Sequence, residues 1–143
     1  MQSKVIVRRD TSAWTFQVWA SFGIAVFLCA LGILNMPSAH LERAFLALGY
    51  FFCLSSAFVL SKTVRDNQAE RVDSGAWMLQ VWVAFSIALI LTGWGLLRMS
   101  IGPWEQAYMF ATWLYLISAA FTLQKTIRDK HEADLLEQPA AAQ

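Results

Sequence analysis

Two copies of one charged motif, Lys-Thr-aliphatic-Arg-Asp, carry the side chains best suited to chemistry in this chain. The motif occupies residues 62–66 and again residues 125–129. In a helix its Lys and Asp lie four positions apart on one face, where such a pair contributes about 0.2–0.5 kcal/mol. Its Arg carries a planar guanidinium that suits bidentate contacts with carboxylate or phosphate groups. The candidate site residues are therefore Lys62, Arg65, Asp66, Lys125, Arg128 and Asp129.

Three roles are open for these motifs. In the first, they only mark helix ends at a membrane surface, where cations suit the helix dipole and lysine reaches the headgroups. In the second, Arg65 pairs with Asp129 and Arg128 pairs with Asp66, so that two ion pairs clamp the halves of the chain together. In the third, the two arginines bind an anionic lipid headgroup or another small anion.

Two glutamines form a second candidate site. Gln17 and Gln80 each lie in the sequence Gln-Val-Trp, about one turn inside an apolar stretch. A hydrogen bond between the two amides would fix how the helices pack, although such bonds in membranes contribute less than about 2 kcal/mol. The alternative is that each glutamine contacts water or headgroups at the interface.

The sequence lacks the motifs of the common enzyme classes. No Asp, Glu, Lys, Arg or His lies deep in its long apolar stretches, which argues against a proton relay or an ion-coupled pump. It contains no nucleotide-binding fingerprint, zinc-ligand spacing or nucleophile elbow. We therefore expect no enzymatic activity, no catalytic residues, no cofactor and no bound metal. Glu42 and Glu105, which open two apolar stretches, are interpreted as favourable charges at helix N-termini.

The composition indicates the environment in which these residues are placed. Of 143 residues, 57% are hydrophobic and only 15% are charged, whereas soluble domains average about 25% charged residues. The net charge of +1 gives no general attraction to nucleic acid. Seven tryptophans are typical of a chain that meets membrane interfaces. The composition thus argues against a soluble enzyme, a disordered regulator and a nucleic-acid-binding protein.

Four uncharged stretches are long enough to cross a bilayer, for which a helix needs about 20 apolar residues. They cover residues 14–34, 44–61, 77–97 and 106–124. The sequence therefore predicts an all-α integral membrane protein with four transmembrane helices, at about residues 14–34, 42–62, 77–97 and 105–125.

The basic residues predict the orientation. Nine of the eleven lysines and arginines lie before the first helix, between the second and third, or after the fourth. Only Arg43 and Arg98 lie near the other two connections. Because segments rich in Lys and Arg remain in the cytoplasm, we expect a multi-pass membrane protein with both termini and the central linker in the cytoplasm.

The chain also repeats itself at an offset of 63 positions. Asp10 to Trp19 align with Asp73 to Trp82, and the motif at 62–66 aligns with that at 125–129. An even number of helices in each copy inserts both copies in the same orientation, as a parallel repeat. We expect a bundle of two helical hairpins. The predicted segments are a cytoplasmic N-terminus (1–12), a first repeat (13–66), a cytoplasmic linker (67–75), a second repeat (76–129) and a disordered cytoplasmic tail (130–143).

Two-helix repeats that end in Lys-Thr-aliphatic-Arg-Asp resemble the YiaA/YiaB family of bacterial inner-membrane proteins, whose unit is the YiaAB two-helix domain. The resemblance covers about residues 12–130. In the family pattern the first helix of a unit ends near Gly-x-x-Asn and the second opens near Glu-Lys-Gly-aromatic. The corresponding residues here are Gly32, Asn35, Glu42, Arg43 and Ala44 in the first unit, and Gly95, Arg98, Glu105, Gln106 and Ala107 in the second. The resemblance implies four helices in the inner membrane and implies no activity.

Small residues recur at every fourth position on three of the predicted helices, which allows helix backbones to approach closely in lipid. These lines are Ser21, Ala25 and Cys29; Gly49, Cys53, Ala57 and Ser61; and Ala84, Ala88 and Thr92. They serve either packing within the chain or association with a second copy.

These features favour a small accessory or scaffold protein that associates with itself or with a partner. The alternatives are a passive carrier or channel for a small uncharged or amphipathic molecule, and a lipid-binding protein with a role in envelope stress. A polar line along the bundle axis would favour the carrier, whereas a closed apolar axis with outward-facing small residues would favour the accessory protein. The expected partners are the lipid bilayer, a second copy of the chain and an anionic lipid, and not nucleic acid.

Overall fold

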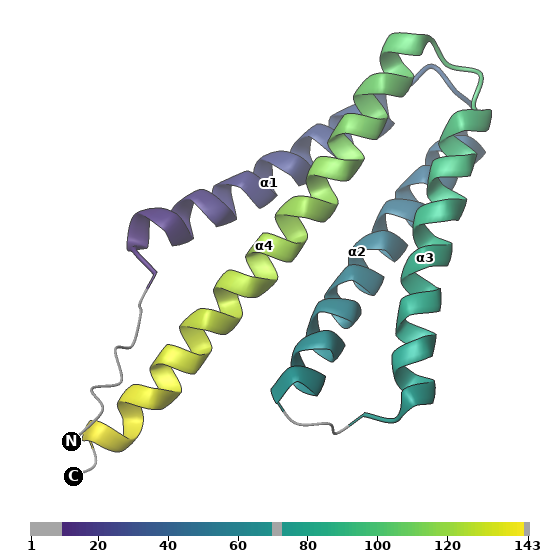
Figure 1. The fold of residues 1–143 in the computed structure, drawn as a ribbon. Helices are drawn as coiled ribbons and strands as arrows, with labels where there is room; N and C mark the ends of the chain where they lie inside the picture. Colours follow the sequence, from purple (N-terminus) through teal and green to yellow (C-terminus); the bar gives the residue numbers. More distant parts are fainter. Residues whose placement is uncertain (1–9, 70–72, 142–143) are drawn as a thin grey trace.

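The computed structural model describes residues 10–69 and 73–141, and this part of the chain is folded into four helices without a strand. The helices are α1 (Ser12–Asn35), α2 (His40–Ala69), α3 (Gly75–Arg98) and α4 (Pro103–Ala141). The α1–α2 and α3–α4 connections lie at one end of the molecule, and α2 is followed by α3 at the other (Figure 1). The all-helical prediction is confirmed.

The first helix of each repeat begins at a hydroxyl cap. The side chain of Thr11 accepts a hydrogen bond from the backbone N–H of Trp14 at 3.3 Å, and Ser74 accepts one from Trp77 at the same distance. Such caps satisfy one of the free N–H groups at a helix start. The matching caps fix the same starting point for α1 and α3, in agreement with the repeat in the sequence.

The second helix of each repeat is longer than expected. Helices α2 and α4 were predicted to end near residues 62 and 125, but they continue to Ala69 and Ala141. The prediction of a disordered tail over 130–143 was therefore wrong as far as Ala141. Polar residues that favour helix extend α4, Arg128 and Glu132 pair at 3.8 Å four positions apart, and Ala133 is buried. The expected N-terminal segment 1–12 lies mostly outside the described residues, as does the middle of the linker.

Three helical segments are long and apolar enough to cross a membrane, namely Ser12–Asn35, His40–Gln68 and Gly75–Arg98. Helix α4 is not among them, because its apolar half contains hydroxyl-bearing side chains such as Thr112 and Tyr115. This helix packs against all three others, and contact with protein in place of lipid relaxes the demand for hydrophobicity. That α4 crosses the membrane as a fourth span stays a prediction.

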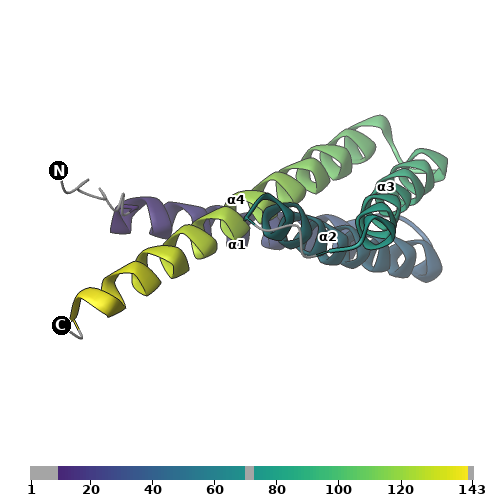
Figure 2. The ribbon, with the colours of Figure 1, turned by 60° about the horizontal axis from the view of Figure 1, so that its bottom comes forward.

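The helices pair between the repeats rather than within them. Helix α1 packs mainly along α4, and α3 packs mainly along α2, whereas the two helices of one repeat touch only near their connection (Figures 1 and 2). Helix α2 also crosses α4, and α1 does not contact α3. The predicted bundle of two helical hairpins is thus not confirmed, because each first helix packs mainly on the second helix of the other repeat.

The centre of this interlocked arrangement is a pair of equivalent residues. Tyr50 and Trp113 occupy the same position in the two repeats, and their rings stack at 6.4 Å with an angle of 10°. The Tyr50 hydroxyl donates a hydrogen bond to the carbonyl of Met109 at 3.1 Å. Leu46 and Met109, again equivalent, are fully buried beside them. The contact between α2 and α4 is therefore filled by side chains and offers no passage.

The lines of small residues serve this packing. On α1, Cys29 donates a hydrogen bond to the carbonyl of Thr112 on α4 at 3.3 Å. On α3, Thr92 lies so close to Gly49 of α2 that a Cβ at Gly49 would approach its hydroxyl oxygen to 2.6 Å. Ala25, Ala57 and Ala88 have no exposed surface. These faces are consequently used within the chain and are not free for a second copy.

Candidate functional site

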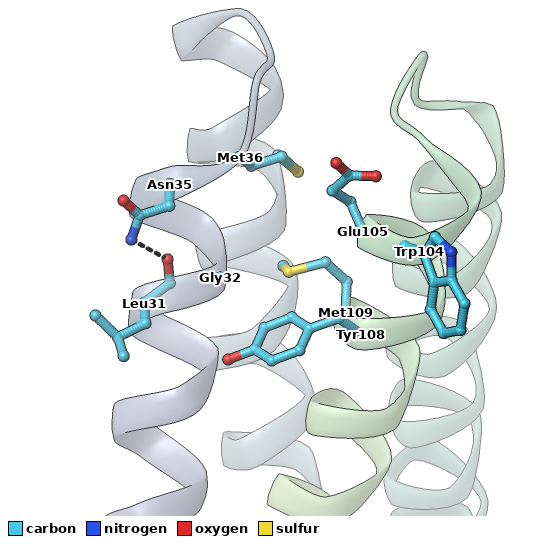
Figure 3. A pocket seen from close by; sticks show the side chains of 8 residues that line it. All are labelled: Leu31, Gly32, Asn35, Met36, Trp104, Glu105, Tyr108 and Met109. Atoms are coloured by element: carbon cyan, nitrogen blue, oxygen red, sulfur yellow. Dashed lines mark hydrogen bonds between the residues drawn. The ribbon is translucent and has the colours of Figure 1, made fainter.

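The interlocking creates a groove between α1 and α4 at the end of the molecule where the repeats' connections lie. This groove, here called groove 1, has a volume of about 510 Å³. Its lining residues are Leu31, Gly32, Asn35, Met36, Trp104, Glu105, Tyr108 and Met109 (Figure 3). The rim residues Leu31, Asn35 and Trp104 are exposed, so that groove 1 is accessible from outside the molecule.

A second groove lies at the equivalent place between α2 and α3. Groove 2 has a volume of about 280 Å³. It is lined by Leu41, Glu42, Phe45, Trp94, Gly95, Arg98 and Met99. Each of these residues is the repeat equivalent of a residue in groove 1, at the offset of 63 positions. The duplication has therefore produced two versions of one groove.

A glycine makes the close helix approach at each groove. A Cβ at Gly32 would lie 2.6 Å from the sulfur of Met109 and 2.8 Å from the ring of Tyr108. A Cβ at Gly95 would overlap the ring of Phe45. In both places the glycine of the first helix lets an aromatic side chain of the other repeat lie against the helix backbone.

These contacts explain the two parts of the sequence pattern noted above. The Gly-x-x-Asn end of α1 faces the segment of α4 that begins with Glu105, and the Gly95 end of α3 faces the segment of α2 that begins with Glu42. The next residue in each case, Arg43 or Gln106, donates to a carbonyl near the end of the preceding helix, at 2.6 Å and 3.1 Å. Each groove is thus assembled from the first helix of one repeat and the second helix of the other.

The two grooves differ in charge. In groove 1 the amide of Asn35 donates to the carbonyl of Leu31 at 2.8 Å, and Tyr108 donates to the carbonyl of Leu28 at 2.8 Å. The carboxylate of Glu105 lies over Gly102 at the start of α4, where a Cβ would overlap it, and it lines groove 1 at the end where Met36 lies (Figure 3). In groove 2 the equivalent of Asn35 is Arg98, whose guanidinium lies 5.7 Å from the centre of the Trp94 ring.

The charged motifs lie at the other end of α2 and α4, inside the helices rather than at their ends. Arg65 pairs with the adjacent Asp66 at 3.7 Å, and Arg128 pairs with the adjacent Asp129 at 3.4 Å. In the described part of the chain, neither the predicted cross-repeat clamp nor the Lys62–Asp66 and Lys125–Asp129 pairs are formed. The lower parts of α2 and α4 diverge (Figure 1), which keeps the two motifs apart.

The buried member of each motif is its threonine. Thr63 and Thr126 are only 4% and 3% exposed, whereas Lys62 and Lys125 are exposed. The sequence alone predicted no role for these threonines, although their occurrence at the same place in both copies of the motif could have indicated one. The structure places them as packing residues and leaves the charged side chains at the surface.

The predicted glutamine pair is not formed, since Gln17 lies on α1 and Gln80 on α3, and these helices do not touch. Both side chains are exposed. Gln17 instead lines a narrow notch of about 110 Å³ between α1 and α4. The notch residues are Trp14, Gln17, Val18, Ser21, Tyr115, Ser118, Ala119 and Thr122, and the hydroxyls of Ser21 and Tyr115 are hydrogen-bonded at 2.5 Å.

Comparison with known proteins identifies the repeat. The yiaA/B two-helix domain matches residues 14–66 and again residues 77–129. The chain belongs to the YiaAB two-helix domain family. No curated protein and no solved structure matches the chain. The resemblance and the internal repeat seen in the sequence thus correspond to two YiaAB units, and both grooves lie between these units.

Proposed function

We propose that this YiaAB protein is a non-enzymatic accessory protein of the bacterial inner membrane that binds an amphipathic membrane molecule in the grooves between its units. In this proposal both termini lie in the cytoplasm, and all four helices cross the bilayer. The grooves then lie at the outer surface of the membrane. The observation that carries the proposal is the duplicated groove, which combines an apolar lining with one carboxylate at its end.

The exposed surface supports placement in a membrane. Large apolar side chains that face outward include Phe16, Leu34, Leu48, Phe51 and Ile90, all more than half exposed. Exposed apolar side chains of this number are unfavourable in water and favourable in lipid. Trp104 is 87% exposed near the outer end, where an indole suits the headgroup level.

The packing disfavours the other functions that the sequence left open. A carrier needs a continuous polar path, but the contact between α2 and α4 is filled by Tyr50 and Trp113. Association through the small-residue faces needs those faces to be free, but they pack within the chain. A lipid-binding role needs neither a continuous polar path nor free small-residue faces, because it uses a groove at the periphery of the helix bundle.

The dimensions and chemistry of groove 1 suit an amphiphile. Its volume of about 510 Å³ lies within the range of about 300–1,000 Å³ that is typical of ligand sites. Leu31, Met36 and Met109 offer apolar surface, while Asn35 and Glu105 are polar groups at the end nearest the connections. An acyl chain along the helices and a polar headgroup at the membrane surface would match this gradient.

Native mass spectrometry of the gently extracted protein tests the proposal. Leu31→Trp fills groove 1 from its rim, where Leu31 is 38% exposed, and is expected to reduce co-purified lipid. Leu34→Trp is the matched control, because Leu34 lies on the same helix, is 69% exposed and does not line the groove. Equal lipid occupancy in both variants and the wild type would contradict the proposal.

The same spectra test two further proposals. A second copy of the chain, bound through surfaces other than the small-residue faces, would appear as a dimer mass. An anionic lipid held by the motif arginines would be lost in the Arg65→Ala/Arg128→Ala variant. A lipid that is lost in this variant and retained in Leu31→Trp would move the binding site to the cytoplasmic end.

A further inference from the structure

We infer that groove 1 binds the ammonium headgroup of a lipid from the outer leaflet, with the carboxylate of Glu105 as its counter-charge. This inference rests on the proposed function and specifies its ligand. The two grooves are formed by equivalent residues of the two repeats, and the difference between them indicates the ligand.

Groove 2 already contains a cation. Its Arg98 carries a guanidinium 5.7 Å from the Trp94 ring, in the same groove as Glu42. A cation over an aromatic face is attracted by the ring quadrupole. Among the described residues Arg98 and Glu42 form no ion pair, although both line groove 2. Groove 2 thus combines an acid, an aromatic face and a positive charge supplied by the protein itself.

Groove 1 keeps the acid but lacks the cation, and Leu31 stands at the position of Trp94. Its aromatic lining comes from Trp104 and Tyr108 instead. Asn35 replaces the arginine, and its amide is turned to the carbonyl of Leu31. Among the described residues Glu105 forms no ion pair. The basic side chain of Arg43 is directed to the carbonyl of Met36 at 2.6 Å. An external cation would give groove 1 the positive charge that Arg98 gives groove 2.

The space available agrees with the missing group. Groove 1 measures about 510 Å³ against about 280 Å³ for groove 2. Trp104 and Tyr108 contribute two aromatic rings to groove 1, as Phe45 and Trp94 do to groove 2. An ammonium group near Glu105 would find both a charge partner and aromatic surface, which are the elements that recognise alkylammonium ligands.

The position of groove 1 selects a lipid rather than a soluble amine. Its lining runs from Glu105 and Asn35, next to the connections, to the apolar Leu31 and Met109 further along the helices. The ammonium end of the ligand would lie at the membrane surface and its acyl chain against the helices. A lipid with an ethanolamine headgroup fits this order of groups, whereas a lipid with a glycerol headgroup has a negative phosphate and no positive charge for Glu105.

The test compares lipids with identical acyl chains and different headgroups. The purified protein is titrated with phosphatidylethanolamine or phosphatidylglycerol, and the bound lipid is counted by native mass spectrometry. The wild type is expected to prefer phosphatidylethanolamine by about tenfold, as a charge-assisted contact allows. Glu105→Gln is expected to abolish the preference while lipid still binds. Equal binding of the two lipids to the wild type would overturn the inference.

Two further variants keep the result interpretable. Glu42→Gln makes the same change in groove 2, which also contains Arg98, and is expected to retain the preference for phosphatidylethanolamine. If Glu42→Gln lost this preference as completely as Glu105→Gln, the assignment to groove 1 would be contradicted. Asn35→Arg supplies groove 1 with the cation of groove 2 and is expected to reduce phosphatidylethanolamine binding. Unchanged binding in Asn35→Arg would also overturn the inference.

The outcomes separate this inference from the proposed function. Lipid that binds groove 1 without headgroup preference, and is displaced by Leu31→Trp, would support the proposed function and refute the ammonium assignment. Absence of any groove-dependent lipid would refute both. Full competition by ethylammonium chloride at the lipid's own concentration would show that a soluble amine, rather than a lipid, is the occupant.

Discussion

The α1–α4 and α2–α3 interfaces are two copies of one helix pairing that have diverged in polarity. Along α1 and α4, hydrogen bonds join Ser21 to Tyr115 and Tyr108 to the carbonyl of Leu28. At the equivalent places of the other interface stand Ala84, Phe52 and Phe45, which cannot form these bonds. Both interfaces keep the same close approach at Gly32 and Gly95.

This difference separates what the fold requires from what one site requires. The glycines and small residues present in both interfaces maintain the packing distance on which the interlocked fold depends. The hydroxyl contacts of Tyr108 and Tyr115 and a groove with a carboxylate but no cation occur together on the α1–α4 side. The α2–α3 side has a contact between Thr92 and Cys53 at 3.5 Å, and its groove contains Arg98. We interpret the α2–α3 interface as the structural copy and the α1–α4 interface as the binding copy, and four predictions test this division.

The largest effect is expected from separating the repeats. Because both main interfaces join one repeat to the other, neither repeat should be stable alone. Residues 1–69 and 70–143, co-expressed as separate chains with a tag on one, are expected to co-purify as a pair. The tagged first repeat expressed alone should be degraded or aggregate. Independent stability of one repeat would contradict the interlocked packing.

Adding a methyl group at each glycine distinguishes the two interfaces. Gly32→Ala should destabilise the protein by about 1–3 kcal/mol, as overpacking does, because Tyr108 is held by its hydrogen bond to Leu28 and cannot easily move. Gly95→Ala should cost less, because the Phe45 ring, which is as exposed as that of Tyr108 at 39%, has no hydroxyl to hold it in place and can move aside. Unfolding in mixed detergent measures both.

The control for this comparison is Gly23→Ala. A Cβ at Gly23 has nothing within 4 Å, so that the variant reports only the helix propensity gained, about 0.5–1 kcal/mol. Subtracting this gain isolates the cost of packing. If Gly95→Ala proves as costly as Gly32→Ala, the tyrosine anchor does not distinguish the interfaces.

A double-mutant cycle on Ser21→Ala and Tyr115→Phe measures the polar contact itself. The coupling free energy is expected to be about 0.6 kcal/mol, the average for hydrogen bonds in a membrane protein. The reciprocal pair, Ala84→Ser with Phe52→Tyr, should install a similar coupling if the two interfaces share their geometry. No coupling in either pair would mean that the hydroxyl contact is incidental.

The smallest effect is expected from exchanging charges between the motifs. Arg65 and Arg128 pair with adjacent aspartates that are themselves partly exposed, and such pairs contribute about 0–1 kcal/mol. The loss of unfolding free energy in the double variant Arg65→Asp/Asp129→Arg should therefore equal the sum of the losses in the two single variants. A double variant that is clearly more stable than this sum predicts would indicate that the clamp forms in the protein.

Local patterns in the sequence determined the helices, the repeat and the family. Uncharged stretches and caps such as Thr11 and Ser74 specify where helices form, because helix formation depends on neighbours a few positions away. The same reasoning failed at the C-terminal ends, where polarity at residues 62–66 and 125–129 was taken as the end of a helix. Charged residues end the apolar part of a helix without ending the helix itself.

Only the tertiary structure decided which helices pair and which residues share a groove. The buried and the outward faces of these helices are both apolar, so that no amphipathic stripe marks the partner helix. The choice depends on shape, such as Gly32 against Tyr108 and Gly95 against Phe45, between residues distant in sequence. For that physical reason the duplicated motifs were visible in the sequence, whereas the exchange of helices between the repeats was not.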